Sequence, residues 1–243
     1  MGIFTPKWKS SDRLTAGNAI RKMKYGPKKK EIIIEIIETG RRDIIFDALC
    51  GCVSDQEFLM SIYTKYNDKI IRGTALCFIS DSDFLRKSIV EEHSPYYEAV
   101  MSLSHHNGQK KFAIDILTRE IEIGIPHERS SFWYYVCEII QKDITDEDKK
   151  TISNAILVSN DRYVVEQTIK MFKGLKDIDI LKDLAGEGII SPWTPYNGRV
   201  TQWIAEEYVM RCARDALISM GIADEKWSAP RKRSECKKYI INV

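Results

Sequence analysis

The sequence repeats itself at short, nearly regular intervals, and this constrains the fold more than any other feature. An alanine followed by an aliphatic residue, with a further apolar residue three positions later, starts at Ala19, Ala48, Ala75 and Ala99. These alanines are separated by 29, 27 and 24 residues. A unit of this size cannot bury an apolar face alone, and so it must stack against its neighbours. The pattern therefore predicts a repeat protein.

A second phrase repeats with a period of 26 residues. Residues 53–59 and 79–85 share a Ser-Asp pair and, three positions after its Asp, a Phe-Leu pair. Ser54 and Ser80, or the aspartate after each, are residue types that cap helix N-termini, so we expect a helix to begin there with its Phe-Leu pair facing inward. Related phrases start at Thr168 and Ala216.

The spacing of apolar residues favours helices throughout. Residues 58–63 and 112–117 each place apolar side chains at i, i+1, i+4 and i+5, which is one face of a helix. Glu31 to Glu38 carries five isoleucines with high strand propensity, but Ile33, Ile36 and Ile37 share one helical face and we predict a helix. A turn at 124–129 is expected before another helix, whose inward residues are Phe132, Trp133, Val136, Cys137 and Ile140.

Composition indicates a globular protein, with 44% hydrophobic and 30% charged residues among 243. No uncharged apolar run approaches the ~20 residues of a membrane span, and the N-terminus lacks the layout of a signal peptide. We therefore expect a cytoplasmic protein without a membrane partner. The six cysteines form no Cys-x-x-Cys pair and are interpreted as small buried hydrophobes.

One segment resembles a known repeat family. Residues 68–76, Asp-Lys-Ile-Ile-Arg-Gly-Thr-Ala-Leu, are similar to the core of the second helix of a HEAT repeat, and the opening from Pro6 to Leu14 is similar to the start of some bacterial HEAT-like proteins. The resemblance covers about residues 6–103 and 161–220. It implies an all-α fold, a right-handed α-α superhelix of stacked antiparallel helix pairs over residues 1–226, followed by a basic tail at 227–243.

HEAT-like solenoids bend to leave an extended concave surface that binds macromolecules. The resemblance therefore implies a non-enzymatic scaffold or adaptor that docks a protein partner on its concave face. An enzyme is a third possibility, since short HEAT-like repeats resemble those of bilin lyases and some base-excision enzymes. However, the sequence carries no phosphate loop, nucleophile elbow or paired-histidine metal motif, and it assigns no catalytic residue, metal or cofactor.

Positive charge is concentrated at the two ends of the chain. Residues 1–42 have a net charge of +7 and residues 221–243 of +3, although the whole chain has only +2. The alternative function is therefore nucleic-acid binding by the basic N-terminal repeats, through phosphate contacts. A solvated capping face explains the same charges. The candidate phosphate-binding residues are Arg21, Lys22, Lys24, Lys28, Lys29, Lys30, Arg41 and Arg42.

A loop at residues 187–199 interrupts the helical pattern with two prolines and two aromatic residues. Exposed Trp193 and Tyr196 beside Arg199 would form a partner-binding site, because these three residue types dominate the energetics of protein interfaces. Alternatively, Trp193 folds back over the end of the adjacent helix pair.

Overall fold

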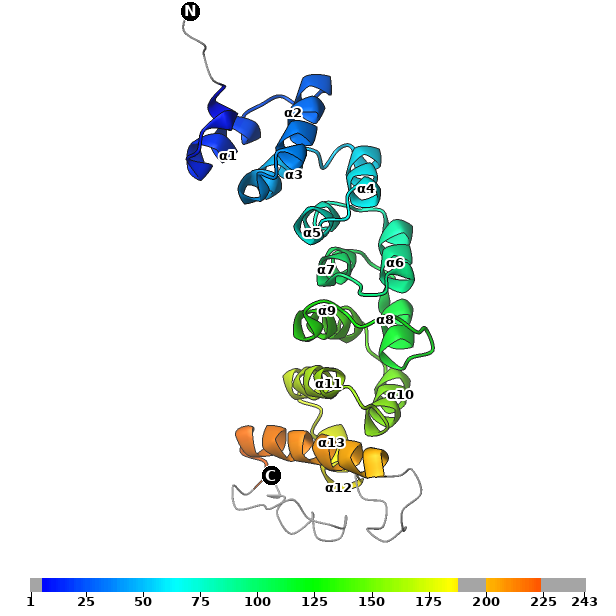
Figure 1. Cartoon of the computed structure of the whole chain (residues 1–243). Helices are drawn as coiled ribbons and strands as arrows, with labels where there is room; N and C mark the ends of the chain where they lie inside the picture. Colours follow the sequence, from blue (N-terminus) through cyan, green and yellow to red (C-terminus); the bar gives the residue numbers. More distant parts are fainter. Residues whose placement is uncertain (1–5, 188–199, 224–243) are drawn as a thin grey trace, which may run out of the picture. The chain divides into compact units, whose positions relative to one another are not determined.

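The structure of the protein is a computed structural model, which describes residues 6–187 and 200–223 (Figure 1). The elements of these residues are helices, and no strand is found among them, so the predicted all-α fold is confirmed. The chain divides into two compact units, residues 1–106 (unit 1) and 107–243 (unit 2). A single domain over residues 1–226 stays a prediction, and the proposed tail at 227–243 lies outside the described residues.

The helices are short and are joined by tight turns. In unit 1 they are η1 (Lys7–Lys9), α1 (Arg13–Arg21), α2 (Pro27–Glu38), η2 (Arg42–Ile44), α3 (Ile45–Cys50), α4 (Gln56–Lys65), α5 (Lys69–Leu76), α6 (Ser82–Glu91) and α7 (Tyr97–Ser104). In unit 2 they are α8 (Lys110–Leu117), α9 (Arg129–Gln141), α10 (Asp146–Leu157), α11 (Arg162–Gly174), α12 (Ile178–Glu187) and α13 (Val200–Ser219).

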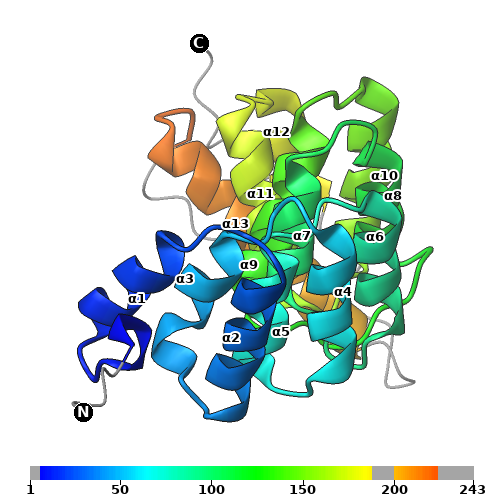
Figure 2. The same ribbon diagram turned by 90° about the horizontal axis from the view of Figure 1, so that it is seen from above.

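Unit 1 consists of two rows of helices. Helices α1, α3, α5 and α7 contact one another in that order, and α2, α4 and α6 each pack on the odd-numbered helix that follows (Figures 1 and 2). Ala48, Ala75 and Ala99 are buried in α3, α5 and α7, where a small side chain lets neighbouring helices approach. This packing of each helix against its neighbours is compatible with a helical repeat solenoid.

The first alanine of the series behaves differently. Ala19 is only half-buried, whereas Ala16 and Gly17 are buried in α1. Asp47 of α3 lies against Gly17 so closely that a methyl group there would be 3.0 Å from the Asp47 Cγ atom. The small residue at the α1–α3 contact is therefore Gly17, and the expected role of Ala19 is corrected.

The 26-residue period is visible in the polar contacts of unit 1. The Lys9 Nζ atom donates to Glu35 at 2.6 Å, and the Arg21 Nε atom donates to Asp47 at 2.6 Å, each pair being 26 residues apart. Two more contacts have the same 26-residue separation. They are the Arg42–Asp68 ion pair and the hydrogen bond that the Ser102 hydroxyl donates to the Leu76 carbonyl at 2.6 Å. One repeat therefore bonds to the next at equivalent positions.

The predicted helix starts are confirmed, and the aspartates do the capping. Asp55 accepts from the Phe58 amide at 3.0 Å, and Asp81 accepts from the Phe84 amide at 2.9 Å. Leu59 is fully buried behind its cap, as is its counterpart Leu85. The isoleucine-rich segment forms α2, which buries Ile33, Ile36 and Ile37 as predicted.

Unit 2 repeats the same scheme with longer helices. Helix α11 contacts both α9 and α13, while α8, α10 and α12 pack on α9, α11 and α13 respectively. The inward face predicted for α9 is confirmed, because all five of its named residues are buried. Within the two described ranges, no helix has the length and apolar content needed to cross a membrane.

Candidate functional site

The eight basic residues proposed to contact phosphate are largely occupied by contacts within unit 1. Four of them form ion pairs with carboxylates, three of which come from the next repeat. The pairs are Arg21–Asp47, Lys30–Asp55, Arg41–Asp43 and Arg42–Asp68. The local excess of positive charge in residues 1–42 is thus partly neutralised by aspartates that follow it in the sequence.

Lys29 is buried, which is unusual for a lysine. It is 3% exposed, and its Nζ atom donates to the Met23 carbonyl at 3.3 Å. Its side chain crosses the backbone of Gly51, where a methyl group would lie 3.0 Å from the Lys29 Cε atom. Lys22, Lys24 and Lys28 differ from it, because they are exposed and have no carboxylate partner among the described residues.

The Lys30 contact also changes the acidity of its partner. Asp55 accepts hydrogen bonds from Lys30, from the Tyr25 hydroxyl at 2.6 Å and from the Phe58 amide. These donors stabilise the carboxylate and lower the pKa of Asp55 to about 2. The Lys30 Nζ atom also lies 5.1 Å from the centre of the Phe58 ring, so its charge is satisfied within the fold.

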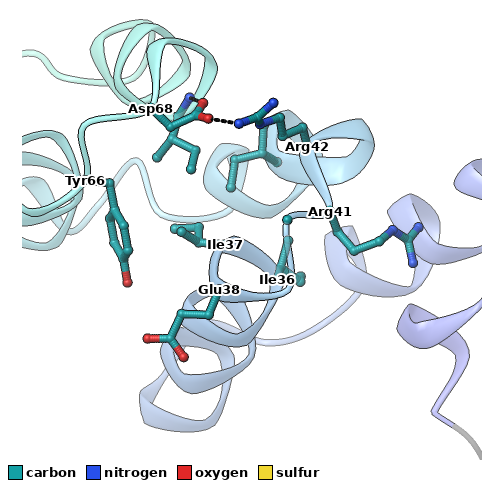
Figure 3. A pocket seen from close by; sticks show the side chains of 10 residues that line it. Ile36, Ile37, Glu38, Arg41, Arg42, Tyr66 and Asp68 are labelled. Atoms are coloured by element: carbon teal, nitrogen blue, oxygen red, sulfur yellow. Dashed lines mark hydrogen bonds and ion pairs between the residues drawn. The ribbon is translucent and has the colours of Figure 1, made fainter.

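Arg41 and Arg42 also line a pocket of about 250 Å³ in unit 1 (Figure 3). It lies where the end of α2 and η2 meet the turn between α4 and α5. Its apolar lining consists of four isoleucines, two from α2 and one each from α3 and α5, namely Ile36, Ile37, Ile45 and Ile71. We refer to it as the isoleucine pocket.

Two polar groups of the isoleucine pocket have no partner among the described residues. The Tyr66 hydroxyl is buried without a hydrogen bond, and the Glu38 carboxylate is exposed and forms no ion pair. In Figure 3 both side chains extend toward the same side, away from the Arg42–Asp68 pair, while Arg41 points away from Tyr66. The Arg41 guanidinium donates to the Ser10 carbonyl at 3.0 Å and pairs with Asp43.

Sequence reasoning found Arg41 and Arg42 but missed Tyr66 and Glu38. No repeat phrase includes either residue, and one signal could have found Tyr66. It directly precedes Asn67-Asp68, at the turn between two predicted helices, where side chains from successive repeats meet.

The arginine of the HEAT-like phrase has a structural role. The Arg72 guanidinium lies 4.1 Å from the centre of the Tyr63 ring and forms an ion pair with Glu92. The Tyr63 hydroxyl donates to the same carboxylate at 2.8 Å, and burial is the main cause that raises the pKa of Tyr63. This cluster ties α4 and α5 to the turn before α7.

The residues predicted to bind a partner through the 187–199 loop, Trp193, Tyr196 and Arg199, lie outside the described residues. Among the residues that the structure does describe, no group of His, Cys, Asp and Glu side chains could hold a metal ion. No family model, curated protein or solved structure matches the chain. The candidate site therefore stands on its own geometry.

Proposed function

We propose that this protein is a non-enzymatic, HEAT-like α-solenoid, a right-handed superhelix of antiparallel helix pairs, that docks a protein partner. The isoleucine pocket of unit 1 is the observation that supports this function best. Docking on the concave face, with Trp193, Tyr196 and Arg199 as a second contact region, completes the proposal.

The isoleucine pocket suits one large apolar side chain of a partner. Its volume of about 250 Å³ is smaller than most small-molecule pockets, which measure about 300–1,000 Å³. Burying a leucine or phenylalanine side chain contributes roughly 1.5–3 kcal/mol. The unpartnered Tyr66 hydroxyl can bond to the backbone of the same segment, and Glu38 at the rim favours a partner with a positive charge beside the anchor residue.

Nucleic-acid binding is the second candidate function. It is supported by Lys22, Lys24 and Lys28, which are exposed and unpaired in the described part of the chain. It is disfavoured by the ion pairs of Arg21, Lys30, Arg41 and Arg42, since breaking an existing pair offsets the gain from a phosphate contact. Three lysines support weaker binding than eight basic residues would.

Site-specific photo-crosslinking tests the docking proposal. A photoreactive amino acid is placed at Glu38, on the rim of the pocket, and in a matched variant at Glu57, an exposed residue of α4 in the same unit. After irradiation in the native host, we expect one discrete protein adduct from position 38 and none from position 57. Equal labelling of many proteins from both positions, or an adduct with nucleic acid from position 38, would contradict the proposal.

A further inference from the structure

Unit 2 contains a pocket that no sequence motif indicated. It has a volume of about 400 Å³ and lies between the end of α8, the connection to α9, and the turn before α11. We refer to it as the two-arginine pocket, because Arg119 and Arg129 both line it.

The backbone is constrained at both ends of the α8–α9 connection that lines this pocket. Arg119 and Glu128, at the two ends of the α8–α9 connection, adopt left-handed backbone conformations with φ of 61° and 50°. Such conformations are costly for residues other than glycine and persist only where the surrounding structure imposes them. The Ile121 amide donates to the Asp115 carbonyl at 3.1 Å, and the Phe132 amide donates to the Glu128 carbonyl at 3.0 Å. The connection is therefore fixed at both ends.

Three hydrogen-bond donors of this pocket have no acceptor in the described part of the chain. The guanidinium groups of Arg119 and Arg129 form no hydrogen bond, ion pair or ring contact with the described residues. Among the other described arginines, this is true of Arg13 alone. The third donor is the indole N–H of Trp133, which has no hydrogen-bond partner although the residue is only 3% exposed. Buried polar groups are nearly always hydrogen-bonded in native proteins, so the Trp133 N–H indicates a missing acceptor. The Arg119 and Arg129 side chains, exposed and half-buried respectively, have donors available to the same acceptor.

The acceptors of the pocket limit the charge of that missing group. Glu122 is an exposed carboxylate, Asn160 supplies an amide, and Asp161 already accepts from the Tyr163 amide at 2.9 Å as the cap of α11. The two carboxylates balance the formal charge of the two arginines. A singly charged acceptor such as a carboxylate therefore fits better than a dianion such as phosphate.

The remaining lining is aliphatic. It is formed by four isoleucines and a proline, namely Ile116, Ile121, Ile123, Ile125 and Pro126. We propose that the two-arginine pocket binds an apolar monocarboxylate, with the carboxylate at Arg119 and Arg129 and the aliphatic body against the isoleucines. A branched organic acid and the C-terminal residue of a peptide share this chemistry.

The indole N–H signal of Trp133 in a 15N NMR spectrum reports on this pocket, and the variant Trp133→Phe assigns it. The full-length protein is titrated with 4-methylpentanoate, with N-acetyl-Gly-Leu as the free acid, with its C-terminal amide, and with inorganic phosphate. We expect both carboxylates to shift the Trp133 signal, whereas the amide and phosphate leave it unchanged. Tighter binding of the peptide acid or of the free acid then identifies the source of the ligand.

Arginine variants test the assignment of the carboxylate. Arg119→Gln and Arg129→Gln should each weaken binding by about tenfold or more, because each removes charge-assisted hydrogen bonds. Lys170→Gln, an exposed position of α11 in the same unit, should leave binding unchanged. Unchanged binding in the folded arginine variants, a failure of both acids to bind, or binding of phosphate as tight as that of the acids would overturn the proposal.

Discussion

The contact between α1 and α3 offers a substitution whose effect on stability reverses with its surroundings. Gly17 is in the interior of α1, where replacing glycine by alanine ordinarily stabilises a helix by about 1 kcal/mol. Here the new methyl group would lie 3.0 Å from the Asp47 Cγ atom and closer still to its carboxylate. Carbon atoms pack best at about 3.5–4.0 Å, and overpacking of this kind costs about 1–3 kcal/mol. We therefore expect Gly17→Ala to destabilise unit 1 by about 1 kcal/mol.

The reversal appears when Asp47 is shortened. In an Asp47→Ala background the obstruction is absent, and the Arg21 side chain that loses its partner is 57% exposed, so no buried charge is left behind. Gly17→Ala should then stabilise the protein by about 1 kcal/mol, which corresponds to a coupling of about 2 kcal/mol between the two sites. Urea denaturation followed by circular dichroism at 222 nm measures all four proteins. The same sign of effect in both backgrounds would refute the reasoning.

Three further predictions follow from the described contacts. Leu59→Ala should lower the free energy of unfolding by about 2–5 kcal/mol, because Leu59 is fully buried between helices; urea denaturation checks this, and a cost near zero would contradict the packing. Since the pKa of Asp55 is lowered to about 2 from 3.8, its contribution to stability is present above about pH 4 and is lost as the pH falls toward 2; acid titration of Asp55→Asn should show a smaller loss in that window, and an unchanged acid transition would argue against it. Replacing Lys22, Lys24 and Lys28 together by Gln should leave recovery of a protein partner unchanged in affinity capture, whereas capture of nucleic acid that this variant loses would favour the nucleic-acid alternative.

The repeat phrases predicted the helices well because each phrase carries its own local signal. Asp55 and Asp81 cap helices within a few residues of the leucines that they bring inward, so the whole feature is contained in one short segment. The isoleucines of α2 were predicted in the same way from a shared helical face. Such signals need no knowledge of which helices later become neighbours.

Contacts between repeats were less accessible to sequence reasoning. Lys29 was predicted as one of eight candidate phosphate-binding residues, but the helical position that it occupies directs it across Gly51 and buries it. The ion pairs of the basic residues depend on side chains about one repeat away, as with Arg42 and Asp68. The separation of Arg21–Asp47 and of Arg42–Asp68 is 26 residues, which equals the period of the phrases, so pairing opposite charges at that offset would have found these two pairs.

The two pockets were the hardest features to predict. Tyr66 and Trp133 count as apolar residues when the periodicity of apolar side chains is analysed. Their importance comes from one polar atom in each side chain that the fold leaves without a hydrogen-bond partner. That property depends on every neighbour of the atom in three dimensions. A one-dimensional pattern contains no signal for it.

Affinity capture from the native host tests the central claim of protein docking most directly. The wild-type chain and Glu38→Arg, which reverses the charge at the rim of the isoleucine pocket, are each captured with and without nuclease at low and moderate salt. The account predicts that the wild-type chain retains a stoichiometric protein through nuclease and moderate salt and that Glu38→Arg loses it. Recovery that disappears with nuclease or salt, and that Glu38→Arg does not alter, would contradict it.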